Sequence, residues 1–118
     1  MKRDINVFLE DILKSIQLLN KYTTGKTKED YENDDELHDA IHRRLEIIGE
    51  AVRHIPQNFR NQYPEVPWKE IAGTRDILIH EYFEVSDERI WKTVIEDLPL
   101  LVEQITKILQ NIKENSSH

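Results

Sequence analysis

The chain has 118 residues, a formal net charge of −7 at pH 7 and no cysteine. This length fits one domain, so we expect residues 1–118 to form a single domain around one core. The lack of cysteine excludes disulfides, thiolate nucleophiles and cysteine-based zinc sites. No apolar run approaches the ~18 residues of a membrane span, and acidic residues interrupt any leader-like stretch near the start. We therefore expect a cytoplasmic protein with no membrane partner.

The charge is unevenly distributed along the chain. Residues 26–40 hold two lysines against seven acidic side chains, whereas residues 41–75 hold six basic side chains against four acidic ones. Because phosphate binding depends on Lys and Arg, the overall charge argues against tight, indiscriminate binding of nucleic acid. It permits a local basic cleft in the middle third of the chain.

The first half of the chain shows apolar residues at helical spacings of three and four. Residues 4–23 predict one helix, with Asp4 as its N-cap and Gly25 as its stop. A helical turn is expected around Tyr31, and a second long helix then runs up to Pro56, which cannot continue it. The expected inner face of this second helix is Leu37, Ile41, Leu45, Ile48, Ala51, Val52 and Ile55.

The second half predicts a connector and two further helices. The connector at 56–67 holds three prolines and has room for one short helix. Residues 67–80 form the third helix, with Pro67 in its first turn. Ser86 begins a fourth helix that continues toward the C-terminus, and Pro99 should kink or split it. The pattern as a whole predicts an all-α domain of four to five helices.

Gly49 and Gly73 both fall inside predicted helices, where glycine costs ~1 kcal/mol relative to alanine. A close approach of two helix backbones would account for both. We favour such a contact between the second and third helices, and the alternative is that the glycines are merely tolerated.

The third helix ends in a crowded run of polar and apolar residues, Arg75-Asp76-Ile77-Leu78-Ile79-His80-Glu81-Tyr82. Five residues of ideal helix turn through about 500°, so Arg75 and His80 lie roughly 140° apart. A site that uses both needs a bend near His80 or a second copy of the chain, which a two-fold dimer supplies. Asp76 lies four residues before His80 and could hold its imidazole through a hydrogen bond.

These residue types suit cleavage of an RNA phosphodiester without a metal. Histidine can take a proton from a ribose 2′-hydroxyl or give one to the leaving oxygen, and arginine offers a planar fork of donors to the transition state. The competing interpretation is structural. Arg75 would form a surface ion pair with Asp76 or Glu81, and His80 would be stabilised by the dipole at a helix C-terminus.

Two histidines in the second helix raise the question of a metal. His38 and His42 are four residues apart, as ligands on one helix face would be. Their neighbours Asp39 and Arg43 indicate a solvated face, so we expect no metal site.

The charged residues of the same helix have a simpler interpretation. Glu46 and Glu50 are better explained by helical ion pairs with nearby arginines than by acid–base catalysis. Arg44 or Arg53 could line an RNA cleft, and the sequence does not choose between them.

Two longer stretches, RRLEIIGEAVRHIP and PEVPWKEIAGTRDILIHEYFEVSDERIWKTVIEDLPLLVEQI, closely resemble the HepT-like branch of the HEPN superfamily. Proteins of this branch are prokaryotic toxins paired with a minimal nucleotidyltransferase antitoxin. The hallmark of the family is Arg, four residues, His, any residue, Tyr, and it matches here as Arg75, His80 and Tyr82. The resemblance covers nearly the whole chain.

The resemblance implies an antiparallel, up-and-down helical bundle that forms a homodimer, with the Arg and His of both chains in one interfacial cleft. It implies a metal-independent endoribonuclease that needs no cofactor and leaves a 2′,3′-cyclic phosphate. His80 would be the general acid and base, and Arg75 would bind the phosphate and the transition state. Asp76 would orient one or both of them.

The resemblance also implies regulation. The residue matching Tyr82 is where the partner nucleotidyltransferase attaches AMP to silence the toxin, and a bulky negative group there would repel RNA phosphate. One departure is Asp76, which is often Asn in this branch and brings a negative charge beside the phosphate. Asp76 and the acidic net charge favour an alternative function, a non-catalytic dimeric subunit that binds a nucleotidyltransferase.

Overall fold

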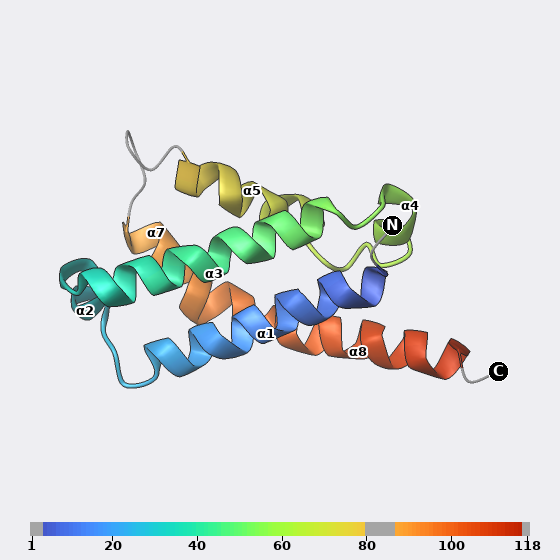
Figure 1. The fold of residues 1–118 in the computed structure, drawn as a ribbon, viewed down its shortest axis with the longest axis horizontal. Helices are drawn as coiled ribbons and strands as arrows, with labels where there is room; N and C mark the ends of the chain where they lie inside the picture. The colour runs from blue at the N-terminus through green and yellow to red at the C-terminus, as the bar shows by residue number, and fades with distance from the viewer. Residues whose placement is uncertain (1–3, 80–86, 117–118) are drawn as a thin grey trace.

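The computed structural model describes residues 4–79 and 87–116, and these residues form a bundle of helices without a strand (Figure 1). Four long helical segments run alternately in opposite directions, which confirms the predicted all-α, up-and-down bundle. They are α1 (Ile5–Thr23), α3 (Asp35–Arg53), α5 (Trp68–Ile79) and a C-terminal segment of α7 (Asp87–Lys92), the π-helical turn η1 (Thr93–Asp97) and α8 (Leu98–Ser116). Ser86, the predicted start of the last segment, lies outside the described residues.

The ends of α1 follow the predicted signals. The Asp4 side chain accepts a hydrogen bond from the backbone N–H of Asn6 at 3.1 Å, so Asp4 is the N-cap. Beyond the helix, Gly25 adopts φ +75°, which glycine reaches without the penalty of a Cβ. Both ends of this helix are therefore set by single residues.

The predicted turn around Tyr31 is the short helix α2 (Lys28–Asn33), and Tyr31 is completely buried. A capping box begins the helix. The Thr27 hydroxyl accepts from the Asp30 N–H at 3.1 Å, and the Asp30 carboxylate accepts from the Thr27 N–H at 2.9 Å. Because this backbone N–H donates to it, the Asp30 carboxyl has a pKa below its usual value. Asp34 then caps the start of α3.

The connector after α3 holds one short helix, α4 (Gln57–Arg60), as the sequence allowed. Arg60 folds back onto the end of α3. Its Nε donates to the Ile55 carbonyl at 2.9 Å, and its Nη2 donates to the Val52 carbonyl at 2.6 Å. A cationic donor beside the last carbonyls of a helix also complements the negative end of the helix dipole.

The prolines of the second half act at helix boundaries. Pro67 precedes α5 instead of lying in its first turn, because α5 begins at Trp68 and the Ile71 N–H donates to the Pro67 carbonyl at 3.1 Å. Pro99 splits the last helix as predicted: the chain widens into η1 immediately before α8, which has Pro99 in its first turn. A π-helical turn there relieves the clash between a proline ring and the preceding turn.

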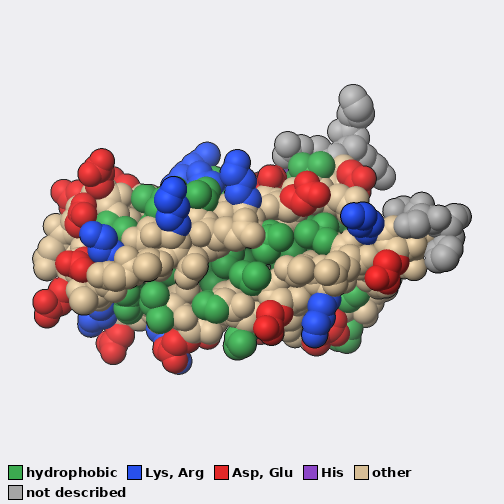
Figure 2. All heavy atoms as spheres, turned by 90° about the horizontal axis from the view of Figure 1, so that it is seen from below, with side chains coloured by type: hydrophobic (Ala, Val, Ile, Leu, Met, Phe, Trp, Pro, Cys, Tyr) green, Lys and Arg blue, Asp and Glu red, His purple; other side chains and the backbone are tan. Residues whose placement is uncertain are grey.

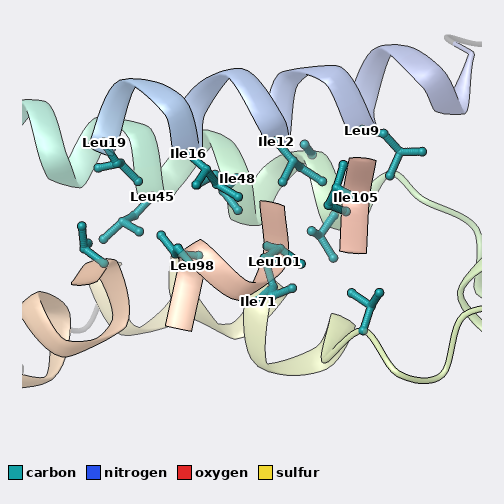
Figure 3. Packing of buried hydrophobic residues seen from close by; sticks show 14 of the residues in the cluster. Leu9, Ile12, Ile16, Leu19, Leu45, Ile48, Ile71, Leu98, Leu101 and Ile105 are labelled. Atoms are coloured by element: carbon teal, nitrogen blue, oxygen red, sulfur yellow. The ribbon is translucent and has the colours of Figure 1, made fainter. Parts of the chain in front are cut away.

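The core fixes α3 at the centre of the bundle (Figure 3). α3 packs between α1 and α5, and the C-terminal segment packs against α1 through η1 and α8. The residues labelled in the figure are Leu9, Ile12, Ile16, Leu19, Leu45, Ile48, Ile71, Leu98, Leu101 and Ile105. All seven residues predicted for the inner face of the second long helix are buried. Each buried Leu, Ile or Val side chain contributes roughly 1.5–3 kcal/mol, so α3 is held firmly in the bundle.

The surface is of mixed charge. On the face shown in Figure 2, acidic and basic side chains are interspersed around hydrophobic ones. Among the described helices, none combines the length and the apolar character needed to cross a bilayer.

Candidate active site

Arg75 lies near the end of α5, where that helix crosses closest to α3. A Cβ added to Gly49 of α3 would lie 2.9 Å from the Arg75 Cβ and 3.2 Å from the Arg75 backbone nitrogen. These distances are shorter than van der Waals contact, so glycine is required at this crossing. The predicted contact between the second and third long helices is confirmed at Gly49. It is wrong for Gly73, around which an added Cβ meets no described atom within 4 Å.

The close crossing brings Arg75 to an acidic side chain of α3. Arg75 Nε lies 3.3 Å from Glu50 Oε2, and Glu50 Oε1 lies 3.3 Å from Nε2 of His54. The three side chains are 33%, 48% and 56% exposed, respectively, so this chain of contacts is open to solvent. One carboxylate thus holds both a guanidinium and an imidazole at the surface.

An aromatic contact fixes the imidazole from its other side. The rings of His54 and Phe8 are stacked, with centroids 5.1 Å apart and planes inclined by only 10°. Phe8 belongs to the buried core, whereas His54 follows the last residue of α3. The stack therefore ties the end of α3 to α1 and holds the His54 ring parallel to a rigid neighbour.

Arg75, Glu50, His54 and Phe8 line an open groove of about 860 Å³, which we call the Arg75 groove. Its floor and walls come from α1, α3, the start of the connector and α5. The lining residues are Ile5, Phe8, Asp11, Arg43, Glu46, Ile47, Glu50, Ala51, His54, Pro56 and Arg75. Apolar surface and charged side chains meet in this groove, as in many sites for small ligands.

The charges in the groove are arranged in neighbouring pairs. Arg43 Nη1 lies 3.7 Å from Glu46 Oε1, and Arg75 Nε lies beside Glu50. The helical ion pair predicted for Glu46 is therefore confirmed. Glu50 contacts His54 one turn along its own helix, but its arginine partner lies on α5 and not on α3 as the sequence suggested.

The cationic lining differs from the sequence-based candidates. Arg43 lines the groove with Arg75, whereas neither Arg44 nor Arg53 is among its lining residues. The signal that could have indicated this is the position of Gly49. Residues next to the helix crossing face α5, so Glu50 was the candidate for contact with Arg75. His54, one turn later, was the candidate for contact with Glu50.

The other predicted site residues lie on or beyond the end of α5. Asp76 is exposed. His80 and Tyr82 lie outside the described residues, so their geometry relative to Arg75 stays a prediction. Arg75 pairs with Glu50 and not with Asp76, whereas Glu81, the other acidic partner expected for Arg75, lies outside the described residues.

His38 and His42 do not form the solvated face that the sequence suggested. His42 Nε2 lies 2.5 Å from the hydroxyl of buried Tyr31, and the His38 ring stacks on Tyr31 at 4.9 Å. His38 Nε2 also lies 3.7 Å from Asp87 Oδ1 at the start of α7. This cluster joins α2, α3 and α7 on the opposite end of α3 from Glu50, which indicates a structural role.

Comparison with known proteins shows which sequences this chain resembles. Residues 12–108 match the family described as Ribonuclease HepT-like. The "Probable ribonuclease HepT" of Thermococcus cleftensis is 44% identical over 92% of this chain and 98% of its own length. A "Putative RNase" of Caldanaerobacter subterraneus subsp. tengcongensis is 47% identical over 90% of this chain and 95% of its own.

One relative is about twice as long. The "Gamma-glutamylcyclotransferase and putative RNase" of Methanocaldococcus jannaschii is 43% identical over 100% of this chain, which spans only 53% of that protein. No solved structure gives a significant match to the fold.

Proposed function

This chain belongs to the HepT-like ribonuclease family, and from that premise we propose that it is a metal-independent endoribonuclease acting through Arg75 and His80. The family match and the relatives named as RNases support a ribonuclease function. The observation that carries the proposal is the position of Arg75, whose guanidinium lies in an open groove of nucleotide-scale volume.

In the proposed reaction Arg75 stabilises the phosphate. Its recorded contact with Glu50 uses Nε, so the two terminal nitrogens of the guanidinium can turn toward a phosphate. The ribose 2′-oxygen attacks phosphorus, the bond to the 5′-oxygen breaks, and a 2′,3′-cyclic phosphate results. Charge that builds on the nonbridging oxygens is met by the guanidinium, whose donors are already in place.

His80 supplies the proton transfers in this proposal. It removes the proton of the 2′-hydroxyl and, through a second copy in a homodimer, protonates the leaving 5′-oxygen. Asp76 orients the imidazole.

We also propose that the chain is the toxin of a type II or type VII toxin–antitoxin pair. A minimal nucleotidyltransferase antitoxin would attach AMP to the hydroxyl of Tyr82, two residues after His80. The added phosphate would repel RNA from the cleft. The variant Tyr82→Phe should cut RNA but escape this modification, and mass spectrometry that finds AMP elsewhere on that variant would refute the assignment.

The Glu50–Arg75 pair favours a second candidate function, a non-catalytic dimeric subunit that binds a nucleotidyltransferase. A carboxylate 3.3 Å from the guanidinium competes with any incoming phosphate. In this case Arg75 would serve the packing of α5 on α3, and no RNA would be cut.

RNA cleavage in the presence of a chelator separates the two functions. Purified wild type is compared with His80→Ala, and the size of each protein in solution is measured by sedimentation. Cleavage that survives the chelator and is lost in the variant supports the nuclease. If the RNA looks the same after incubation with either protein, the non-catalytic subunit is supported. A monomeric wild type that still cuts RNA would refute the dimeric site.

A further inference from the structure

The Arg75 groove contains an aromatic pair that the proposed reaction does not use. His54 covers one face of its ring with Phe8 and remains 56% exposed. A surface imidazole gains little stability from such exposure. The exposed face of the His54 ring instead leaves room for a further aromatic ring to stack on it.

The surroundings of this pair suit a flat, uncharged ring. Four apolar residues, Ile5, Ile47, Ala51 and Pro56, line the same groove as the pair, together with its charged side chains. Nucleobases have a π-face whatever their sequence, and they stack on histidine as well as on Phe, Tyr and Trp in single-stranded RNA. A duplex keeps its bases stacked on one another, so only an unpaired nucleotide can use this surface.

Arg75, the proposed binder of the phosphate, is separated from His54 by the side chain of Glu50. Glu50 Oε1 contacts His54 and Glu50 Oε2 contacts Arg75, so the imidazole and the guanidinium are held on either side of a single carboxylate. Both groups lie 3.3 Å from the same carboxylate, so they are close enough together for the base and the phosphate of one nucleotide to meet them at once. The groove therefore offers a stacking surface for the base of a nucleotide and, next to it, hydrogen-bond donors for the phosphate.

We propose that His54, layered on Phe8, is a nucleobase-binding subsite that holds one unpaired nucleotide of single-stranded RNA while Arg75 binds its phosphate. This inference rests on the proposed ribonuclease function for its substrate. Glu50 is a positioning residue in this arrangement, because it fixes the His54 imidazole and the Arg75 guanidinium without touching the RNA. The subsite selects unpaired over paired RNA and carries little preference among bases.

A structural role is the competing explanation, since His54 also follows the last turn of α3 and ties it to α1. Two variants separate the explanations. His54→Ala removes the ring, whereas His54→Phe keeps a stacking ring but loses the contact with Glu50. Asn58→Ala is the control, because Asn58 is exposed in the neighbouring helix and lines no part of the groove.

The experiment measures equilibrium binding of a fluorescent single-stranded oligoribonucleotide in a His80→Ala background, where the RNA stays intact. A ribose–phosphate oligomer of the same length without bases serves as the second probe. We expect His54→Ala to weaken binding of the RNA about tenfold, which is the loss typical of one removed stacking ring. His54→Phe and Asn58→Ala should bind as tightly as the parent, and none of the variants should change binding of the baseless oligomer.

Three results would overturn the subsite. His54→Ala could bind RNA as tightly as the parent, it could lose the same factor for both probes, or the parent could fail to bind RNA. Failure of the proposed function is separate. If the wild type binds RNA through His54 but cuts none, the nuclease is refuted and the subsite stands in an RNA-binding protein.

Discussion

Replacing Gly49 by alanine should push α5 away from α3 and lower the stability of the bundle. The new Cβ would lie 2.9 Å from the Arg75 Cβ, whereas carbon atoms pack at roughly 3.5–4.0 Å. Both atoms are fixed to helix backbones, so the helices themselves must shift. Such overpacking costs about 1–3 kcal/mol, while alanine in place of a helical glycine returns up to about 1 kcal/mol.

The net expectation for Gly49→Ala is a loss of about 1 kcal/mol, or a fall of roughly 4 °C in Tm for a domain of this size. The matched control is Gly73→Ala on α5, where an added Cβ meets no described atom within 4 Å. Only the helix-propensity term acts there, so the control should gain about 0.5–1 kcal/mol. The two variants thus carry the same chemical change with opposite expected signs.

Urea unfolding followed by circular dichroism at 222 nm measures both variants, with the slope checked for two-state behaviour. A Gly49→Ala protein as stable as the control would refute the close crossing of α3 and α5. A destabilised Gly73→Ala protein would contradict the open surroundings of Gly73.

Three further changes test the elements that hold α3 and α2. Tyr31→Phe removes the hydroxyl 2.5 Å from His42, and we expect a loss of about 0.5–1.5 kcal/mol by urea unfolding, where an unchanged value would refute the bond. Arg60→Ala removes one hydrogen bond to the Val52 carbonyl of α3 and one to the Ile55 carbonyl just beyond that helix, so a loss of about 1–3 kcal/mol is expected, and a loss that disappears at high salt would contradict it. Asp30 has a lowered pKa when folded, so its contribution is present above its usual pKa of 3.8 and is lost as the pH falls through the folded value. Asp30→Asn should therefore be less stable than wild type at pH 6, and the difference should shrink as the pH falls below 3.8; a difference that does not change with pH would rule out the capping carboxylate.

Most of the fold follows from signals that act within a few residues. The Asp4 cap, the Gly25 stop and the break at Pro56 are local, because each depends on the chemistry of one backbone position. The apolar spacing of α3 predicted its buried face for the same reason, since one helix face repeats every three to four residues.

The site was less predictable because it depends on how two helices are aligned. Gly49 and Gly73 give the same signal in the sequence, yet only Gly49 lies at the helix crossing. Glu50 has Arg53 three residues later on its own helix, so a local pair was the simplest prediction, and the contact with Arg75 depends on the register of α5 against α3. The stack of His54 on Phe8 joins residues 46 positions apart, and no local pattern indicates it.

The most direct test of the proposed function is the rate at which Arg75→Gln cuts single-stranded RNA in the presence of a chelator. Glutamine is shorter, but its amide nitrogen can take the place of the Arg75 Nε beside Glu50, while the charge and the two terminal nitrogens are removed. We predict a rate about 100- to 1,000-fold below that of wild type, with Tm nearly unchanged. A folded variant that cuts RNA at the wild-type rate would contradict the claim that Arg75 binds the scissile phosphate.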